Sequence, residues 1–279
     1  MHGYALIRNE LNRAFTSIGM AVSLIVGCGL AVHHFVMVLL TSNYMQGFDG
    51  YASAYPAMNF VPDFLWMMWL PCDGSLFDGY LLFLLLPLLA TLPHAGSMLQ
   101  DRLHGYTDVV FTRARRGCYY ASKWLATFLS GGAVASVPMV LNFLLLLTIF
   151  PVIEPILGSG HVVVERTSTL AELYMLHPLG WTAAWIAIFF VAGGACAIFA
   201  LAVSCITEHG FVVHILPFLL LYVSSMLLSL LGRDDLGFFT LINPLSSTGG
   251  LPALAAELSL LLAAGIVACC VLARRKDAA

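Results

Sequence analysis

Residues 180–206 read GWTAAWIAIFFVAGGACAIFALAVSCI, and none of their side chains is charged. A helix that crosses the hydrocarbon core of a bilayer needs about 20 apolar residues. The run is continuously apolar and does not alternate between apolar and polar positions, which favours a helix over a barrel strand. This stretch therefore predicts a membrane-spanning helix, and it indicates that the chain is an integral membrane protein.

The remaining 252 residues support the same class. Hydrophobic residues make up 60% of the chain and charged residues 10%, with a mean hydropathy of +0.92. Too few charges are present for a soluble globule or a disordered chain, and a net charge of −3 does not fit a nucleic-acid binder. We expect an all-α, polytopic membrane protein with one domain over residues 1–279. Its six spans are expected at about 17–40, 79–99, 124–150, 180–206, 211–231 and 254–273.

The distribution of basic residues predicts the orientation. Ten of the twelve Lys and Arg residues precede the first span, lie between spans two and three, or follow span six. Only Arg166 and Arg233 fall on the other side. Because cytoplasmic loops carry the excess of Lys and Arg, both termini are predicted to be cytoplasmic.

Residues 1–15 have the pattern of an amphipathic helix that lies in the headgroup plane before span one. The alternative is a solvated basic tail. The apolar positions are Tyr4, Ile7, Leu11, Ala14 and Phe15, and the polar positions are mainly Arg8, Asn9, Asn12 and Arg13.

Three further features yield expectations about packing. Residues 60–71 are apolar and rich in tryptophan but too short to span, so they are expected to lie along the outer interface. Cys72 is expected to face the outside. The pairs Gly131-Gly132 and Gly193-Gly194 allow close helix contact, which we expect mainly within the chain.

The segment 100–123, between spans two and three, is the densest cationic segment of the protein. It also carries the acids Asp101 and Asp108, and Gly105 is suited to ending a helix. A loop that served only as a topology signal would need fewer charges. We expect two short helices joined at Gly105, with charged faces that dock on a soluble partner.

This segment resembles the first cytoplasmic loop of the permease subunits of ABC-2 type ABC transporters. In that family an acidic residue is followed by a glycine, a short basic stretch, an aromatic residue and a lysine that opens the third span. Asp101, Gly105, Arg113, Arg116, Tyr119 or Tyr120, and Lys123 occupy those places. The resemblance extends over the N-terminal helix, the six spans and an Asn-Pro pair before span six. The chain departs from the pattern by having Asp101 where glutamate is commoner and Arg-Ala-Arg-Arg where Ser or Pro often appears.

The resemblance implies a six-span exporter permease in the bacterial cytoplasmic membrane. Two permeases, identical or paralogous, would pair above two ATP-binding subunits, which would hold ATP and magnesium. The chain itself has no phosphate-binding loop, no catalytic residue and no cofactor of its own in this reading. The cargo would be an amphipathic, peptide, drug or lipid-like molecule. The residues implied in coupling to the ATPase are Asp101, Arg102, Gly105, Tyr106, Arg113, Arg115, Arg116, Tyr119, Lys123, Glu208 and His209.

Two other functions stay open at this point. A histidine-dependent intramembrane enzyme would need several of His33, His34, His94 and His214 to converge at one depth, and no metal-ligand spacing is present. An ion-driven secondary transporter would favour inverted repeats and carboxylates near the midplane, and neither is recognisable.

Overall fold

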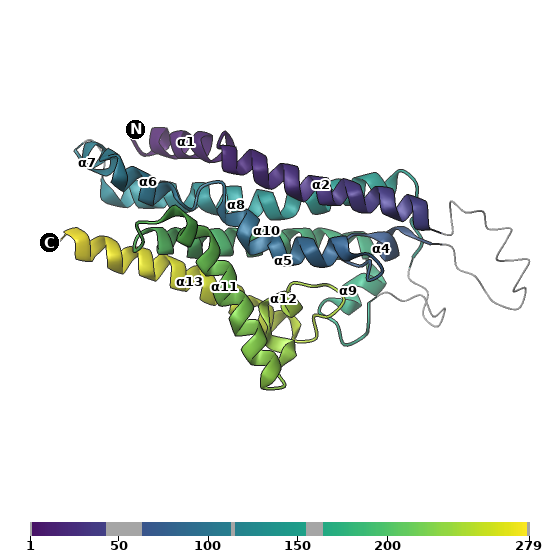
Figure 1. The fold of residues 1–279 in the computed structure, drawn as a ribbon. Coiled ribbons are helices and arrows are strands. Elements are labelled where there is room, and N and C mark those ends of the chain that lie inside the picture. Colours follow the sequence, from purple (N-terminus) through teal and green to yellow (C-terminus); the bar gives the residue numbers. More distant parts are fainter. Residues whose placement is uncertain (1, 43–62, 113–114, 155–163, 278–279) are drawn as a thin grey trace, which may run out of the picture.

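The computed structural model describes residues 2–42, 63–112, 115–154 and 164–277, and all regular elements within those ranges are helical. The long helices form one bundle, and both termini lie at the same end of it (Figure 1). We call this end the terminal end. The long helices of the described residues are apolar, as expected of a transmembrane protein.

Five helices are long and apolar enough to cross a membrane. They agree closely with five of the six predicted spans, except that α8 begins eight residues before the predicted boundary. The five helices are α2 (Ile18–Thr41), α8 (Arg116–Leu147), α10 (Pro178–Ser204), α11 (Gly210–Leu230) and α13 (Gly250–Asp277).

The second predicted span, 79–99, is divided in two. Helix α5 (Phe77–Thr91) is 15 residues long, which corresponds to about 22 Å against a hydrocarbon core of about 30 Å. The chain then turns through Pro93, whose ring cannot continue a regular helix, and α6 (Ser97–Leu103) follows. Helix α5 packs against α2, α8, α10 and α11, so it lies inside the bundle although it is short.

Residues 2–15 form a helix, α1 (His2–Phe15), that packs against α8. The hydroxyl of Ser17 accepts a hydrogen bond from the backbone N–H of Met20 at 3.0 Å, and it thereby caps the following helix and separates it from α1. The burial of residues in α1 differs from the amphipathic pattern expected from the sequence. The fully buried positions are Glu10 and Ala14, while Tyr4 is 76% exposed.

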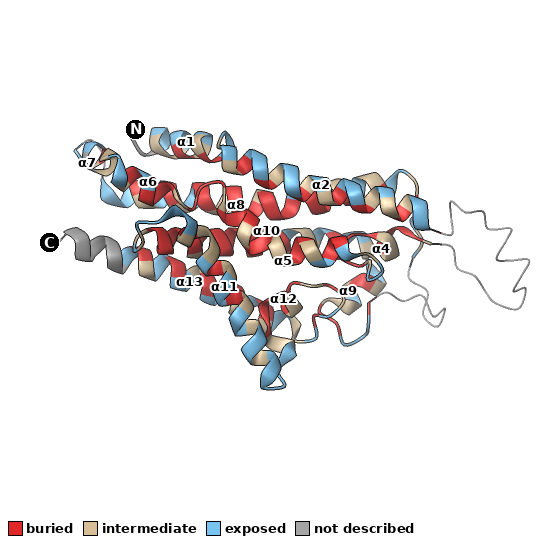
Figure 2. Ribbon diagram, in the orientation of Figure 1, coloured by how far each residue is buried: buried red, intermediate tan, exposed pale blue. Residues whose placement is uncertain are grey.

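The core of the bundle is the contact between α8 and α10, and many residues of both helices are buried (Figure 2). The glycine pairs permit this approach. A Cβ added to Gly193 would lie 2.5 Å from the carbonyl oxygen of Gly131, and one added to Gly194 would lie 2.5 Å from the ring of Phe128. The prediction that these glycines serve packing within the chain is therefore confirmed.

At the end of the bundle opposite the termini, residues 64–72 fold into the bundle, with the single turn α4 (Leu65–Met68). Trp66 and Trp69 are at most 1% exposed, and Trp69 packs edge-on against Trp181. The expectation that this stretch lies along the membrane interface is wrong for these residues, since the rings fill the bundle core. Cys72 is only 4% exposed, so its predicted outward position is also wrong. Residues 43–62 lie outside the described residues.

Three short elements complete the described chain near this end: α9 (Ala171–Leu176), the 3-10 turn η1 (Asp234–Leu236) and α12 (Phe238–Leu241). Helix α7 (Tyr106–Phe111) lies at the terminal end, next to α6.

Candidate functional site

A buried network of charged side chains ties three helices together at the terminal end. Glu10 of α1 and Lys123 of α8 are both fully buried, and their Oε2 and Nζ atoms are 2.7 Å apart. The same Nζ lies 2.7 Å from Oδ2 of Asp101 on α6. Arg13 donates a 2.8 Å hydrogen bond to Oδ1 of Asp101, and it also pairs with Glu10 at 3.1 Å. His94 Nε2 approaches the Glu10 carboxylate at 3.2 Å.

The charges within this network balance. Two carboxylates face two basic side chains, which is the condition for keeping ionised groups out of water. Burial alone would raise the pKa of Glu10, but the hydrogen bond with His94 and the positive charge of Lys123 lower that pKa to about 2. Burial opposes the charge of Arg13 too, yet its carboxylate partners Asp101 and Glu10 hold its pKa above the ordinary value. Glu10 is therefore ionised at neutral pH.

The segment between α5 and α8 is built around a tight turn. Gly105 has φ = +66°, a left-handed conformation that costs a residue with a side chain about 1–2 kcal/mol, and it joins α6 to α7 as the sequence predicts. The phenol of Tyr119 donates a 2.8 Å hydrogen bond to Asp101 Oδ2, and its ring meets Phe111 of α7 edge-on at 5.5 Å. Both ends of the segment are thus fastened to α8.

Arg102 joins this segment to the second connection at the terminal end, between α10 and α11. Its guanidinium donates hydrogen bonds to the carbonyls of Ser204, Cys205 and Thr207, with 2.8 Å to the oxygen of Thr207. These carbonyls lie at the C-terminal end of α10. Carbonyl groups there have no hydrogen-bond donor within the helix, and the helix dipole favours a positive charge. A single planar side chain therefore holds α6 to the turn that contains Glu208 and His209.

The residues implied in coupling fall into two groups that sequence alone did not separate. Asp101, Tyr119 and Lys123 are buried in the network and cannot touch another protein directly. Arg113 lies outside the described residues. Arg102, Gly105 and Tyr106 are half-buried, whereas Arg115, Arg116, Glu208 and His209 are exposed.

Glu10 and its pairing with His94 were not predicted from the sequence. By helical spacing Glu10 falls near Arg13 on the polar side of α1, so it is typical of a solvated position. The available signal was Lys123, because a lysine that precedes a long apolar run without a polar boundary needs a buried carboxylate partner.

The four candidate histidines have separate sets of partners. His33 pairs with Asp78 at 2.9 Å, and His34 lies 3.2 Å from Asp73 and 3.1 Å from the amide of Asn142. His94 contacts Glu10, and His214 shares a 3.1 Å hydrogen bond with Thr91. Within the described ranges, no three His, Cys, Asp or Glu side chains gather as metal ligands.

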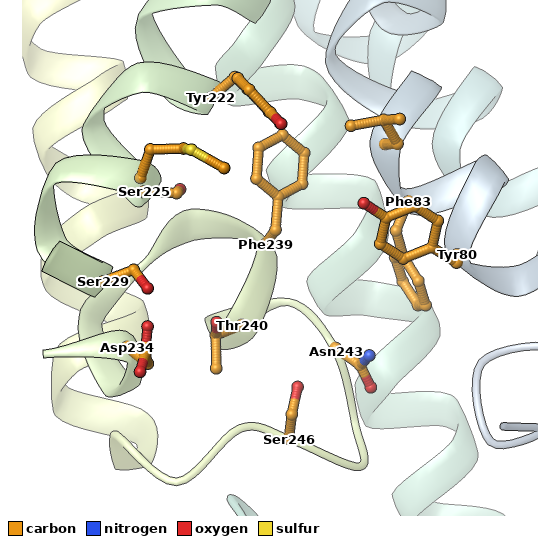
Figure 3. Close-up of a pocket in the computed structure, with 12 residues that line it drawn as sticks. Tyr80, Phe83, Tyr222, Ser225, Ser229, Asp234, Phe239, Thr240, Asn243 and Ser246 are labelled. Atoms are coloured by element: carbon orange, nitrogen blue, oxygen red, sulfur yellow. The ribbon is translucent and has the colours of Figure 1, made fainter. Parts of the chain in front are cut away.

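A cavity of about 320 Å³ opens between α5, α11, η1 and α12, toward the end opposite the termini (Figure 3). One part of its wall is aromatic, with Tyr80, Tyr222 and Phe239. The other carries polar groups, including Asp234 and Asn243. Such a mixture can accommodate a molecule with an apolar body and a polar head.

Comparisons with protein-family models, curated proteins and solved structures find no match to this chain.

Proposed function

We propose that the chain is the permease subunit of an ABC exporter in the bacterial cytoplasmic membrane, with both termini in the cytoplasm. In this proposal an ATP-binding subunit with bound magnesium docks at the terminal end. A second permease, either another copy or a paralogue, completes the translocation path. The chain itself is not an enzyme.

The observation that carries the proposal is the way the α6–α7 segment is attached. A coupling element must transmit force, so it has to be fixed to the helices that move. Asp101 is held by Arg13 of α1 and by Lys123 of α8, and Arg102 is bonded to the end of α10. A push on this segment would therefore reach three elements of the bundle at once. A loop that only set the topology would need none of these bonds.

The exposed surface of the terminal end supports a partner protein. Leu103 and Val109 of the segment are 65% and 55% exposed, and Ile206 beside the Arg102 contacts is 66% exposed. The same two connections of the chain carry the exposed charges Arg115 and Glu208. Apolar residues rimmed by charges are typical of a protein interface.

The cavity beside α11 supports a cargo with amphipathic character. Its aromatic wall would take the apolar part of the molecule, and Asp234 and Asn243 would take a polar head. Because it lies at the end away from the α6–α7 segment, cargo and nucleotide would act on opposite ends of the same helices.

The proposal is tested by purifying the chain together with the product of a neighbouring reading frame that encodes a phosphate-binding-loop ATPase. The expected result is a complex whose mass corresponds to two permeases and two ATPases, with hydrolysis that depends on the reconstituted permease. A chain that purifies alone, while the ATPase is present and folded, would contradict the proposal.

A further inference from the structure

Three sulfur atoms from three different helices meet close to the terminal end. The Sγ of Cys205, directly after α10, lies 3.3 Å from the Sδ of Met98 on α6 and 3.9 Å from the Sγ of Cys269 on α13. Cys269 is fully buried and Met98 is 5% exposed, whereas Cys205 is half-buried and provides a path of entry. This convergence lies outside the ionic network, and the coupling proposal does not use its sulfur atoms.

Two polar groups lie beside this sulfur cluster, although burial favours neutral thiols until a metal ion binds. The indole of Trp124 packs against the cluster, and its buried N–H has no hydrogen-bond partner among the described residues. The guanidinium of Arg102, bonded to the carbonyl of Cys205, adds a positive charge on the other side. An N–H donor and a neighbouring cation both stabilise a thiolate.

The two sulfur–sulfur distances bring Cys205 within reach of an ion that it would share with Met98 and Cys269. Metal–thiolate bonds are about 2.3 Å long. An ion at about 2.3 Å from each sulfur would make an angle of about 116° with the two cysteine sulfurs, which are 3.9 Å apart, and an angle of about 92° with Cys205 and Met98, which are 3.3 Å apart. The first angle is close to the trigonal value, and the second requires the thioether of Met98 to shift outward when the ion binds. Thiolate and thioether ligands select soft ions such as Cu(I). Zinc would require a fourth ligand, and the described part of the chain holds no cluster of three His, Cys, Asp or Glu groups to supply it.

We propose that Met98, Cys205 and Cys269 form a binding site for Cu(I). On binding, the two thiols release two protons and bond to the ion as thiolates, and the neutral thioether of Met98 is the third ligand. The resulting site has a net charge of −1, which Arg102 offsets. Because its ligands come from α6, α10 and α13, the bound ion clamps the segment that follows α5 to the last helix of the bundle.

The test is an anaerobic titration of the full-length, detergent-purified protein with Cu(I) in competition with bathocuproine disulfonate. The wild-type chain is expected to retain one Cu(I), and X-ray absorption is expected to show a shell of sulfur only. Cys205→Ser, Cys269→Ser and Met98→Leu should each weaken binding by at least about tenfold. Met98→Leu preserves side-chain volume, so it tests the thioether without loss of the fold.

Cys118→Ser and Cys270→Ser are the matched controls, because both thiols are exposed, and neither should change the affinity. Equal retention of Cu(I) by the wild type and by a Cys205→Ser/Cys269→Ser variant would overturn the proposal. So would a reduced wild-type protein that fails to hold Cu(I) but forms a Cys205–Cys269 disulfide in air, with a loss of two hydrogens by mass.

Discussion

Glu10 of α1 and Lys123 of α8 form an ion pair in which both side chains are fully buried and the two charged atoms are 2.7 Å apart. Because an unpaired charge in this position would be very unfavourable, each residue fixes the other. The pair also explains how α8 can carry a buried lysine. The helix continues from Arg116 past Lys123 into the apolar core without a polar boundary, since the charge of Lys123 is neutralised by Glu10 and Asp101.

Lys123→Met should destabilise the protein by about 3–5 kcal/mol, because it leaves Glu10 and Asp101 buried without their shared cation. The measurement is the free energy of unfolding in detergent by denaturant titration. Arg233→Gln is the control. It breaks the exposed pair with Asp235 and should leave stability unchanged. Equal stability of Lys123→Met and wild type would show that the pair has no structural role.

The network should also be sensitive to acid. The pKa of Glu10 is about 2 in the folded chain, below its ordinary value of 4.5. The stabilisation from its ionised form is therefore complete above about pH 4.5 and is lost as the pH falls toward about 2. Thermal unfolding followed across this range should show a steeper decline for the wild type than for Glu10→Gln. Parallel curves for the two proteins would contradict the assignment.

Arg102→Lys should loosen the α6–α7 segment from the end of α10. Lysine offers a point charge and cannot reach the three carbonyls that the planar guanidinium bonds. Hydrogen exchange should rise in residues 204–210 and stay constant in the middle of α8. Arg8→Lys, at an exposed position of α1, is the control and should change neither region.

The orientation of the bundle can be tested by labelling in a Cys270→Ser background. Cys118 is exposed at the start of α8, and Thr167 is exposed in the connection between α8 and α10. A membrane-impermeant maleimide added to intact cells should modify Thr167→Cys and spare Cys118. The reverse pattern would place the termini outside and remove the site at which a cytoplasmic ATPase could dock.

The hydropathy pattern predicts most of the fold, because membrane-spanning helices are defined by one local property. The ends of α2, α10 and α11 lie within about two residues of the predicted boundaries. The division of the second span at Pro93 and the burial of Trp66 and Trp69 were not predicted. Both depend on which partners the rest of the chain provides, and a hydropathy window contains no information about partners.

The candidate site was also predicted only in part from the sequence. The density of charge in residues 100–123 indicated a functional segment, and Gly105 indicated its two helices. Which charges face outward depends on Glu10, which lies far away in the sequence and completes the network only after α1 has packed on α8. Long-range pairs of this kind are not visible in a single sequence.

The central claim is that the terminal end docks an ATP-binding subunit, and one measurement tests it most directly. Arg115→Glu/Glu208→Lys reverses two exposed charges at this end, and Glu165→Lys/Arg166→Glu makes the same reversals at an exposed site in the connection between α8 and α10. Both variants keep the net charge and leave the buried network intact. Co-purification with the ATPase and cargo-stimulated hydrolysis in lipid vesicles should be lost in the first variant and unchanged in the second. Wild-type behaviour of both variants would contradict the account.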